Sequence, residues 1–131
     1  MVSPSLLETV VRVAAADPDI RALYVFGSQS SGQARPDSDV DLGVLYRQRQ
    51  PLAATLTLEQ QIEEIIGQHV DVVDLARASA FLALDVVRGE RVFCRDSTET
   101  DRFELYVLRR AGDLLPFERE RQALLLNIPS R

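Results

Sequence analysis

The sequence predicts an α+β fold in which a small mixed sheet packs against helices that lie mainly on one face. Amphipathic stretches and short apolar runs follow one another in the order αββαβαβα. Two of the strand-like runs are joined by a polar loop rich in Gly, Ser and Asp, which is typical of consecutive strands. No repeat or linker interrupts this order, so we expect one domain over residues 1–131.

Composition excludes several classes of protein. Hydrophobic residues make up 46% of the chain and charged residues 27%, which are globular values. The net charge is −5 and no run of basic residues occurs, so we expect no direct binding of nucleic acid. A single cysteine, Cys94, excludes an internal disulfide and a cysteine-based zinc site. With no apolar stretch of about 20 residues and no signal peptide, a cytoplasmic protein without membrane contact is expected.

The first part of the chain reads as a helix and two strands. Residues 3–15 have helical periodicity, and Ser5 with Glu8 fits a capping box. Pro18 ends this helix because the residue before a proline avoids helical geometry. Strands are expected at about 21–26 and 39–45, and a polar turn follows.

Helices and strands alternate through the remainder. A helix is expected at 58–66, with Thr57 and Gln60 as a capping box and Gly67 as its end. A strand over 69–75, a helix over 77–88 and a short extended segment over 91–95 follow. The last helix begins at Ser97, and Pro116 is expected to kink or split it near residue 115 before it continues to 126.

One stretch carries chemistry: Gly27-Ser28, ten residues of loop, then Asp39-Val40-Asp41. Side chains alternate along a strand, so Asp39 and Asp41 share one face while Val40 faces the core. Two adjacent carboxylates repel each other, and a hard cation such as Mg²⁺ is their natural ligand. At the end of the preceding strand, Gly27 allows close approach of the backbone. Ser28 beside it offers hydroxyl and amide donors, which suit phosphate oxygens. The stretch therefore indicates a nucleotide-handling site.

This pattern resembles the nucleotidyltransferase superfamily of polymerase β and, within it, the minimal nucleotidyltransferases of the MntA type. The resemblance rests on Gly27, Ser28, Asp39 and Asp41 at the family's spacing, and it is strongest over residues 22–75. It extends to further positions, among them Gly32, Ala34, Pro36, Ser38 and the segment 114–117. The resemblance implies a polymerase β-like palm as the fold.

The family adds a third acid, flanked by hydrophobic residues on a neighbouring strand. Asp71 and Asp74 both have such neighbours, and they point to opposite faces of a regular strand. Asp74 lies at the strand end, where a carboxylate can cap the next helix. Asp71 is therefore favoured as the third acid.

The resemblance implies roles for these residues. Asp39 and Asp41 would bind two Mg²⁺ ions, while Asp71 would bind the catalytic ion and help to remove the acceptor proton. Gly27 and Ser28 would hold the β- and γ-phosphates of ATP. The family further implies transfer of AMP to a tyrosine of a HEPN ribonuclease toxin, in a hetero-oligomer in which this chain is the antitoxin.

Other polar residues allow two interpretations. Arg35 lies inside the motif loop and can neutralise a triphosphate, as can Arg47 and Arg49, although charged loop residues are most often only solvated. His69 can act as a base beside Asp71, but a lone histidine at the start of a strand is more often structural, and that interpretation is favoured.

Two alternative functions remain open at this point. One is nucleotidylation of an aminoglycoside, but relatives with that activity carry an additional helical domain, and residues 1–131 are expected to form a single domain without one. The other is an antitoxin that neutralises its toxin by binding alone. Two aspartates on one strand face argue against pure binding, which has no need of them.

Overall fold

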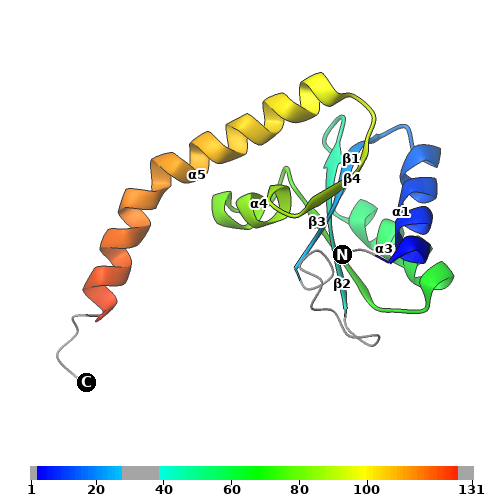
Figure 1. Ribbon diagram of the computed structural model, residues 1–131, viewed down its shortest axis with the longest axis horizontal. Helices are drawn as coiled ribbons and strands as arrows, with labels where there is room; N and C mark the ends of the chain where they lie inside the picture. Colours follow the sequence, from blue (N-terminus) through cyan, green and yellow to red (C-terminus); the bar gives the residue numbers. More distant parts are fainter. Residues whose placement is uncertain (1–2, 28–38, 127–131) are drawn as a thin grey trace.

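The computed structural model describes residues 3–27 and 39–126 (Figure 1). The elements in these ranges follow the expected order. They are α1 (Pro4–Ala16), β1 (Ile20–Phe26), β2 (Val40–Tyr46), α3 (Ala53–Ile66), β3 (Val70–Asp74), α4 (Ala80–Val87), β4 (Glu90–Cys94) and α5 (Ser97–Leu126).

The four strands of the described ranges form one mixed sheet in the order β3-β2-β1-β4. β1 pairs antiparallel with β2 and β4, whereas β2 and β3 run parallel. The end of β1 and the starts of β2 and β3 therefore meet at one end of the sheet. The expected α+β class, with a mixed sheet packed against helices, is confirmed.

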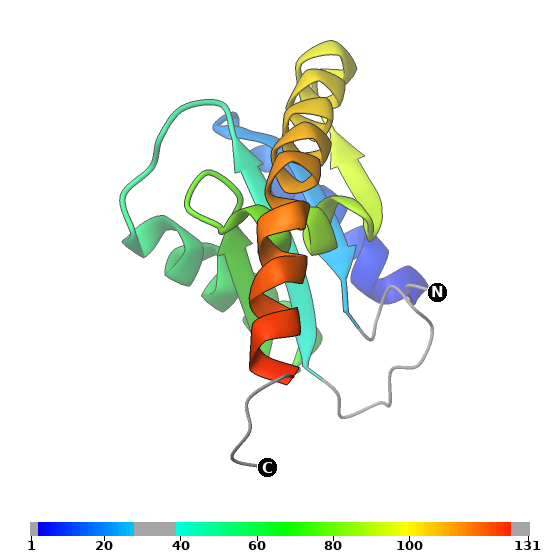
Figure 2. The ribbon, with the colours of Figure 1, turned by 90° about the vertical axis from the view of Figure 1, so that its left-hand side faces the viewer.

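Helices cover both faces of the sheet, so the prediction that they lie mainly on one face is wrong. α1 and α3 pack on one side and α4 and α5 on the other (Figures 1 and 2). The reason is visible in β1, where Leu23 and Val25 face the first cluster and Ala22 and Tyr24 face the second. A strand that is apolar on both faces must be buried on both.

Several helix ends differ from their predicted positions. α1 begins at Pro4 because Ser3, rather than Ser5, is its cap and accepts a hydrogen bond from the Leu6 N–H at 3.3 Å. α3 begins at Ala53, not near residue 58, and the Thr57 hydroxyl donates to the Ala53 carbonyl inside the helix. α4 is shorter than predicted, because Ser79 caps it.

α5 runs without a break through Pro116, so of the predicted kink or split the split does not occur. Its axis turns in the orange part of the helix, and the end of the helix projects beyond the sheet (Figure 1). In the first part of α5, Val107 and Ala111 are buried, whereas residues 112–117 are exposed. A proline in the exposed part bends the helix without disturbing core packing. Within the described ranges, no helix is both long and apolar enough to cross a membrane.

Candidate functional site

Strand pairing brings the predicted acids together at one end of the sheet. Asp41 lies opposite Phe26 of β1 in the antiparallel pair and opposite Asp71 of β3 in the parallel pair. Asp39 directly precedes β2, and the N–H of Val40 donates to the carbonyl of His69 at 2.9 Å. The two parallel strands thus present Asp39, Asp41, His69 and Asp71 side by side.

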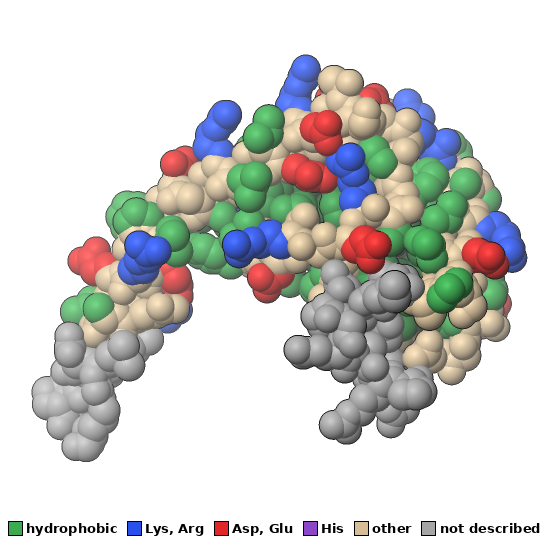
Figure 3. Space-filling model, viewed as in Figure 1, with side chains coloured by type: hydrophobic (Ala, Val, Ile, Leu, Met, Phe, Trp, Pro, Cys, Tyr) green, Lys and Arg blue, Asp and Glu red, His purple; other side chains and the backbone are tan. Residues whose placement is uncertain are grey.

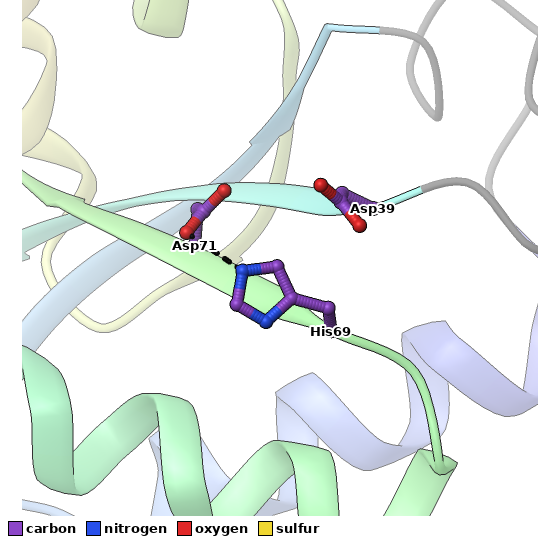
Figure 4. Close-up of side chains that lie close together, drawn as sticks. All are labelled: Asp39, His69 and Asp71. Atoms are coloured by element: carbon purple, nitrogen blue, oxygen red, sulfur yellow. Dashed lines mark ion pairs between the residues drawn. The ribbon is translucent and has the colours of Figure 1, made fainter.

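Ligand atoms of three of these residues lie close enough for one metal ion. One carboxylate oxygen each of Asp39 and Asp71 and one ring nitrogen of His69 are all within 4.8 Å of one another (Figure 4). All three residues are exposed and reachable from solvent. Carboxylate oxygens suit hard divalent cations, and Asp41 adds another beside them. The donor set therefore fits a Mg²⁺-like ion.

We call Asp39, Asp41 and Asp71 the acid set. Asp41 is its half-buried member. Burial raises the pKa of its carboxyl, and the negative charges of Asp71 and Asp39 raise it further, while His69 lowers it in part. Ionised Asp41 is therefore held at an electrostatic cost. A bound cation would remove that cost, which supports the fit of this site to a metal.

Gly27 closes the site from the end of β1. Its φ of +71° lies in the left-handed region that glycine tolerates. A Cβ at this position would lie 2.7 Å from the Asp41 Oδ2, closer than real atoms approach. Glycine therefore leaves the carboxylate of Asp41 in place.

Sequence reasoning favoured a structural role for His69, but its side chain lies within the acid set. His69 Nε2 is 3.2 Å from Asp71 Oδ1, and His69 Nδ1 is 3.1 Å from Glu63 Oε2. Asp71, with Asp39 and Glu63, raises the pKa of the imidazole. The alternation that places Asp71 on this face also places His69 there, because the two residues are two positions apart. That signal was present in the sequence.

Glu63 and Glu59 of α3 were not singled out by the sequence analysis. Glu63 Oε2 accepts from the N–H of Val70 and Glu59 Oε2 from the N–H of Val72, both at 2.8 Å. β3 is an edge strand, so these N–H groups have no neighbouring strand on that side. The two carboxylates fix the strand that carries Asp71 to α3. Only their spacing of four positions on a helix was visible beforehand.

Asp74, the alternative third acid, lies in different surroundings. Its Oδ1 accepts from the N–H of Ala76 at 3.0 Å, and its Oδ2 lies 3.5 Å from Arg77 Nε. It stabilises the turn after β3, whereas Ser79 is the cap of α4. Among the two candidates, the structure places Asp71 beside Asp39 and Asp41.

The basic candidates in the described part of the chain, Arg47 and Arg49, lie away from the site. Ser28 and Arg35 lie outside the described residues. Arg47 follows the opposite end of β2, where its N–H donates to the Asp19 carbonyl, and Arg49 is exposed in the same turn. Neither arginine of this turn can reach a ligand held between Asp39 and Asp71.

Comparisons with known proteins agree with this geometry. Residues 8–98 match the polymerase β nucleotidyltransferase family. The protein adenylyltransferase MntA of Shewanella oneidensis is 31% identical over 82% of this chain and 76% of its own length. The MntA of Aphanizomenon flos-aquae is 28% identical over 96% of this chain and 91% of its own. A solved toxin–antitoxin structure with AMP-PNP has a TM-score of 0.77 at 26% identity, covering 91% of this chain and 94% of that one.

Proposed function

The chain belongs to the polymerase β nucleotidyltransferase family, in its minimal MntA type, and we propose that it transfers AMP from ATP to a hydroxyl of a protein toxin. The acceptor is a tyrosine of a HEPN-type ribonuclease, and the chain is the antitoxin of that pair. The MntA relatives are named protein adenylyltransferases, which supports this reaction. A similar solved structure is a toxin–antitoxin assembly with AMP-PNP.

One observation carries the proposal: Asp39, Asp41 and Asp71 converge on two adjacent parallel strands. Three carboxylates without a described lysine or arginine among them form a site for cations, not for a bare phosphate. Two Mg²⁺ ions held there would neutralise charge on the α-phosphate and on the leaving pyrophosphate. Asp39, Asp41 and Asp71 would hold these ions.

The residues have separate tasks in the transfer. The acceptor oxygen attacks the α-phosphorus of ATP, a new P–O bond forms, and the bond to the β-phosphate oxygen breaks to release pyrophosphate. Asp71 accepts the proton of the acceptor hydroxyl, because it is exposed and lies on β3, the edge strand. Gly27 and Ser28 hold the β- and γ-phosphates, and Arg35 neutralises part of their charge.

A protein acceptor accords with the surface of the chain. The net charge of −5 gives no track for a nucleic-acid backbone. α5 instead exposes large apolar side chains between charged ones (Figure 3). They are Leu105, Tyr106, Leu108, Leu114, Leu115, Phe117 and Leu124. We assign these exposed apolar side chains of α5 to docking of the toxin in a hetero-oligomer.

The test is to incubate the chain with ATP labelled in its α-phosphate, Mg²⁺, the co-expressed toxin and cellular RNA. Label is expected on the toxin and not on tRNA or other RNA. Stable label on RNA, with none on the toxin, would contradict the proposed acceptor and leave nucleotidyl transfer standing. Absence of label on every acceptor, in a preparation that binds the toxin, would favour neutralisation by binding alone.

A further inference from the structure

The Nδ1 atom of His69, on the side of the ring away from Asp71, contacts a carboxylate that lies outside the acid set. Glu63 on α3 contacts Nδ1 at 3.1 Å, and Nε2 faces Asp71 at 3.2 Å. Figure 4 shows the imidazole reaching from the start of β3 toward Asp71, with Asp39 on the neighbouring strand. Ring position and ring rotation are thus both determined by contacts.

This arrangement determines which nitrogen can bind a cation. A carboxylate accepts only, so the protonated imidazole donates to Glu63 from Nδ1 and to Asp71 from Nε2, and Glu63 keeps the proton on Nδ1 when the ring is neutral and a cation takes Nε2. In that neutral ring the Nε2 lone pair points toward Asp71, and a cation replaces the proton that Nε2 otherwise donates to this carboxylate. Histidines that ligate metals are commonly oriented in this way, by a carboxylate behind the second ring nitrogen. A cation between Nε2 and the two exposed aspartates satisfies all of them.

We propose that His69 is a nitrogen ligand of the cation site, positioned by Glu63, and that it makes the site prefer a first-row transition ion such as Mn²⁺ over Mg²⁺. Mg²⁺ takes oxygen ligands almost exclusively, whereas a mixed nitrogen and oxygen set binds first-row transition ions more tightly. The inference rests on the proposed function, since it places this ion at the site of the transfer reaction.

The chain supplies a matched control for Glu63. Glu59 lies one turn away on α3 and also accepts a β3 backbone N–H at 2.8 Å. Its hydrogen bond reaches Val72, three positions after His69, whereas Glu63 contacts the imidazole itself. Glu63→Gln and Glu59→Gln therefore weaken the same kind of strand contact, but only Glu63→Gln changes the partner of the imidazole.

Calorimetric titration of the full, tag-free chain with MnCl₂ or MgCl₂ tests the proposal. The wild type is expected to bind Mn²⁺ more tightly than Mg²⁺. His69→Ala should weaken Mn²⁺ binding about tenfold or more while changing Mg²⁺ binding less than about twofold. Glu63→Gln should also lower the ratio of Mn²⁺ affinity to Mg²⁺ affinity, and Glu59→Gln should leave this ratio unchanged.

A spectroscopic measurement identifies the ligand directly. His69 is the single histidine of the chain, so electron spin-echo modulation of bound Mn²⁺ should show imidazole nitrogen that changes on ¹⁵N-histidine labelling. An unchanged Mn²⁺-to-Mg²⁺ affinity ratio in His69→Ala, with no such modulation, would overturn the inference. If Asp41→Asn abolished binding of both ions in that case, the proposed cation site would stand without His69. Failure of the wild type to bind either ion would overturn both.

Discussion

At the scale of single residues, the acid set combines a functional requirement with an energetic cost. Asp41 is half-buried and lies next to Asp71 and Asp39, and burial together with these charges raises its pKa. A carboxyl with a raised folded-state pKa binds its proton more tightly in the folded state than in the unfolded state. The stability of the metal-free chain therefore falls as the pH rises above the ordinary range of an aspartate, near pH 4.

Asp41→Asn should for this reason stabilise the metal-free protein while removing its activity. Asparagine cannot ionise, so at neutral pH the variant avoids the electrostatic cost of a charged Asp41 in the folded state. At low pH, where Asp41 is already protonated, the variant gains no stability from this change. Thermal unfolding in EDTA is expected to give a higher Tm for the variant at pH 7, with the difference shrinking toward pH 4. A lower Tm for Asp41→Asn at pH 7 would contradict this account of the site.

Asp71 and Asp74 differ in surroundings and should differ in phenotype. Asp71→Asn removes an exposed carboxylate from the acid set, so transfer should fall at least about a hundredfold with the fold intact. Asp74→Asn weakens the turn that holds Ala76 and Arg77, at a cost on the order of 1 kcal/mol in unfolding free energy. Initial transfer rates and urea unfolding of both variants measure these effects. Loss of transfer in Asp74→Asn, with lowered stability only in Asp71→Asn, would show that Asp74 is the third acid.

The acid positions could be predicted because spacing and alternation determine them. The two aspartates around Val40 must share a face, and a third acid on a neighbouring strand completes the set. Alternation also places His69 on the face of Asp71, but its closeness to Asp39 could not be predicted, because a single sequence does not show that β2 and β3 pair in parallel with Val40 opposite Val70. Glu63 could not be found at all, because its contact joins a helix to an edge strand.

At the scale of elements, β2 depends on one residue without a side chain. A Cβ at Gly43 would lie 2.1 Å from Val86 Cγ1, and Val86 is fully buried in α4. Glycine thus sets how closely α4 approaches the strand that carries Asp41.

Gly43→Ala should destabilise the protein by about 1–3 kcal/mol, because the added methyl group overpacks the contact between β2 and α4. Gly112→Ala is the matched control: nothing lies within 4 Å of a Cβ there, and alanine favours a helix by up to about 1 kcal/mol. Urea unfolding of both variants measures the difference. Equal stability changes would show that the packing of α4 on β2 is looser than described.

The order of the elements was predictable, but several boundaries and the layering were not. Helix starts were misplaced where two polar residues could both serve as a cap, as with Ser3 and Ser5. Cap choice depends on where the chain enters the helix, which is a tertiary property. Helices on both faces follow from strands that are apolar on both faces, a signal already present in residues 22–25. α5 passes Pro116 because that stretch is exposed and free to bend.

At the scale of the whole molecule, the cation site and the exposed apolar side chains of α5 serve one proposed reaction. The acids lie at one end of the sheet, while α5 crosses the face opposite to α1 and α3 and extends past it (Figure 2). A toxin that docks on α5 is held by surfaces that contain none of the acids. Binding and catalysis should therefore be separable by mutation.

The most direct test of the central claim is the intact mass of the toxin after incubation with ATP and Mg²⁺, alongside calorimetry of its binding to the chain. With wild-type chain, the toxin is expected to gain the mass of one or more AMP groups. With Asp39→Asn it should gain none in the same time, although it binds the variant with unchanged affinity. An unmodified toxin with wild-type chain, or equal modification by Asp39→Asn, would contradict the claim that this acid set transfers AMP to a protein.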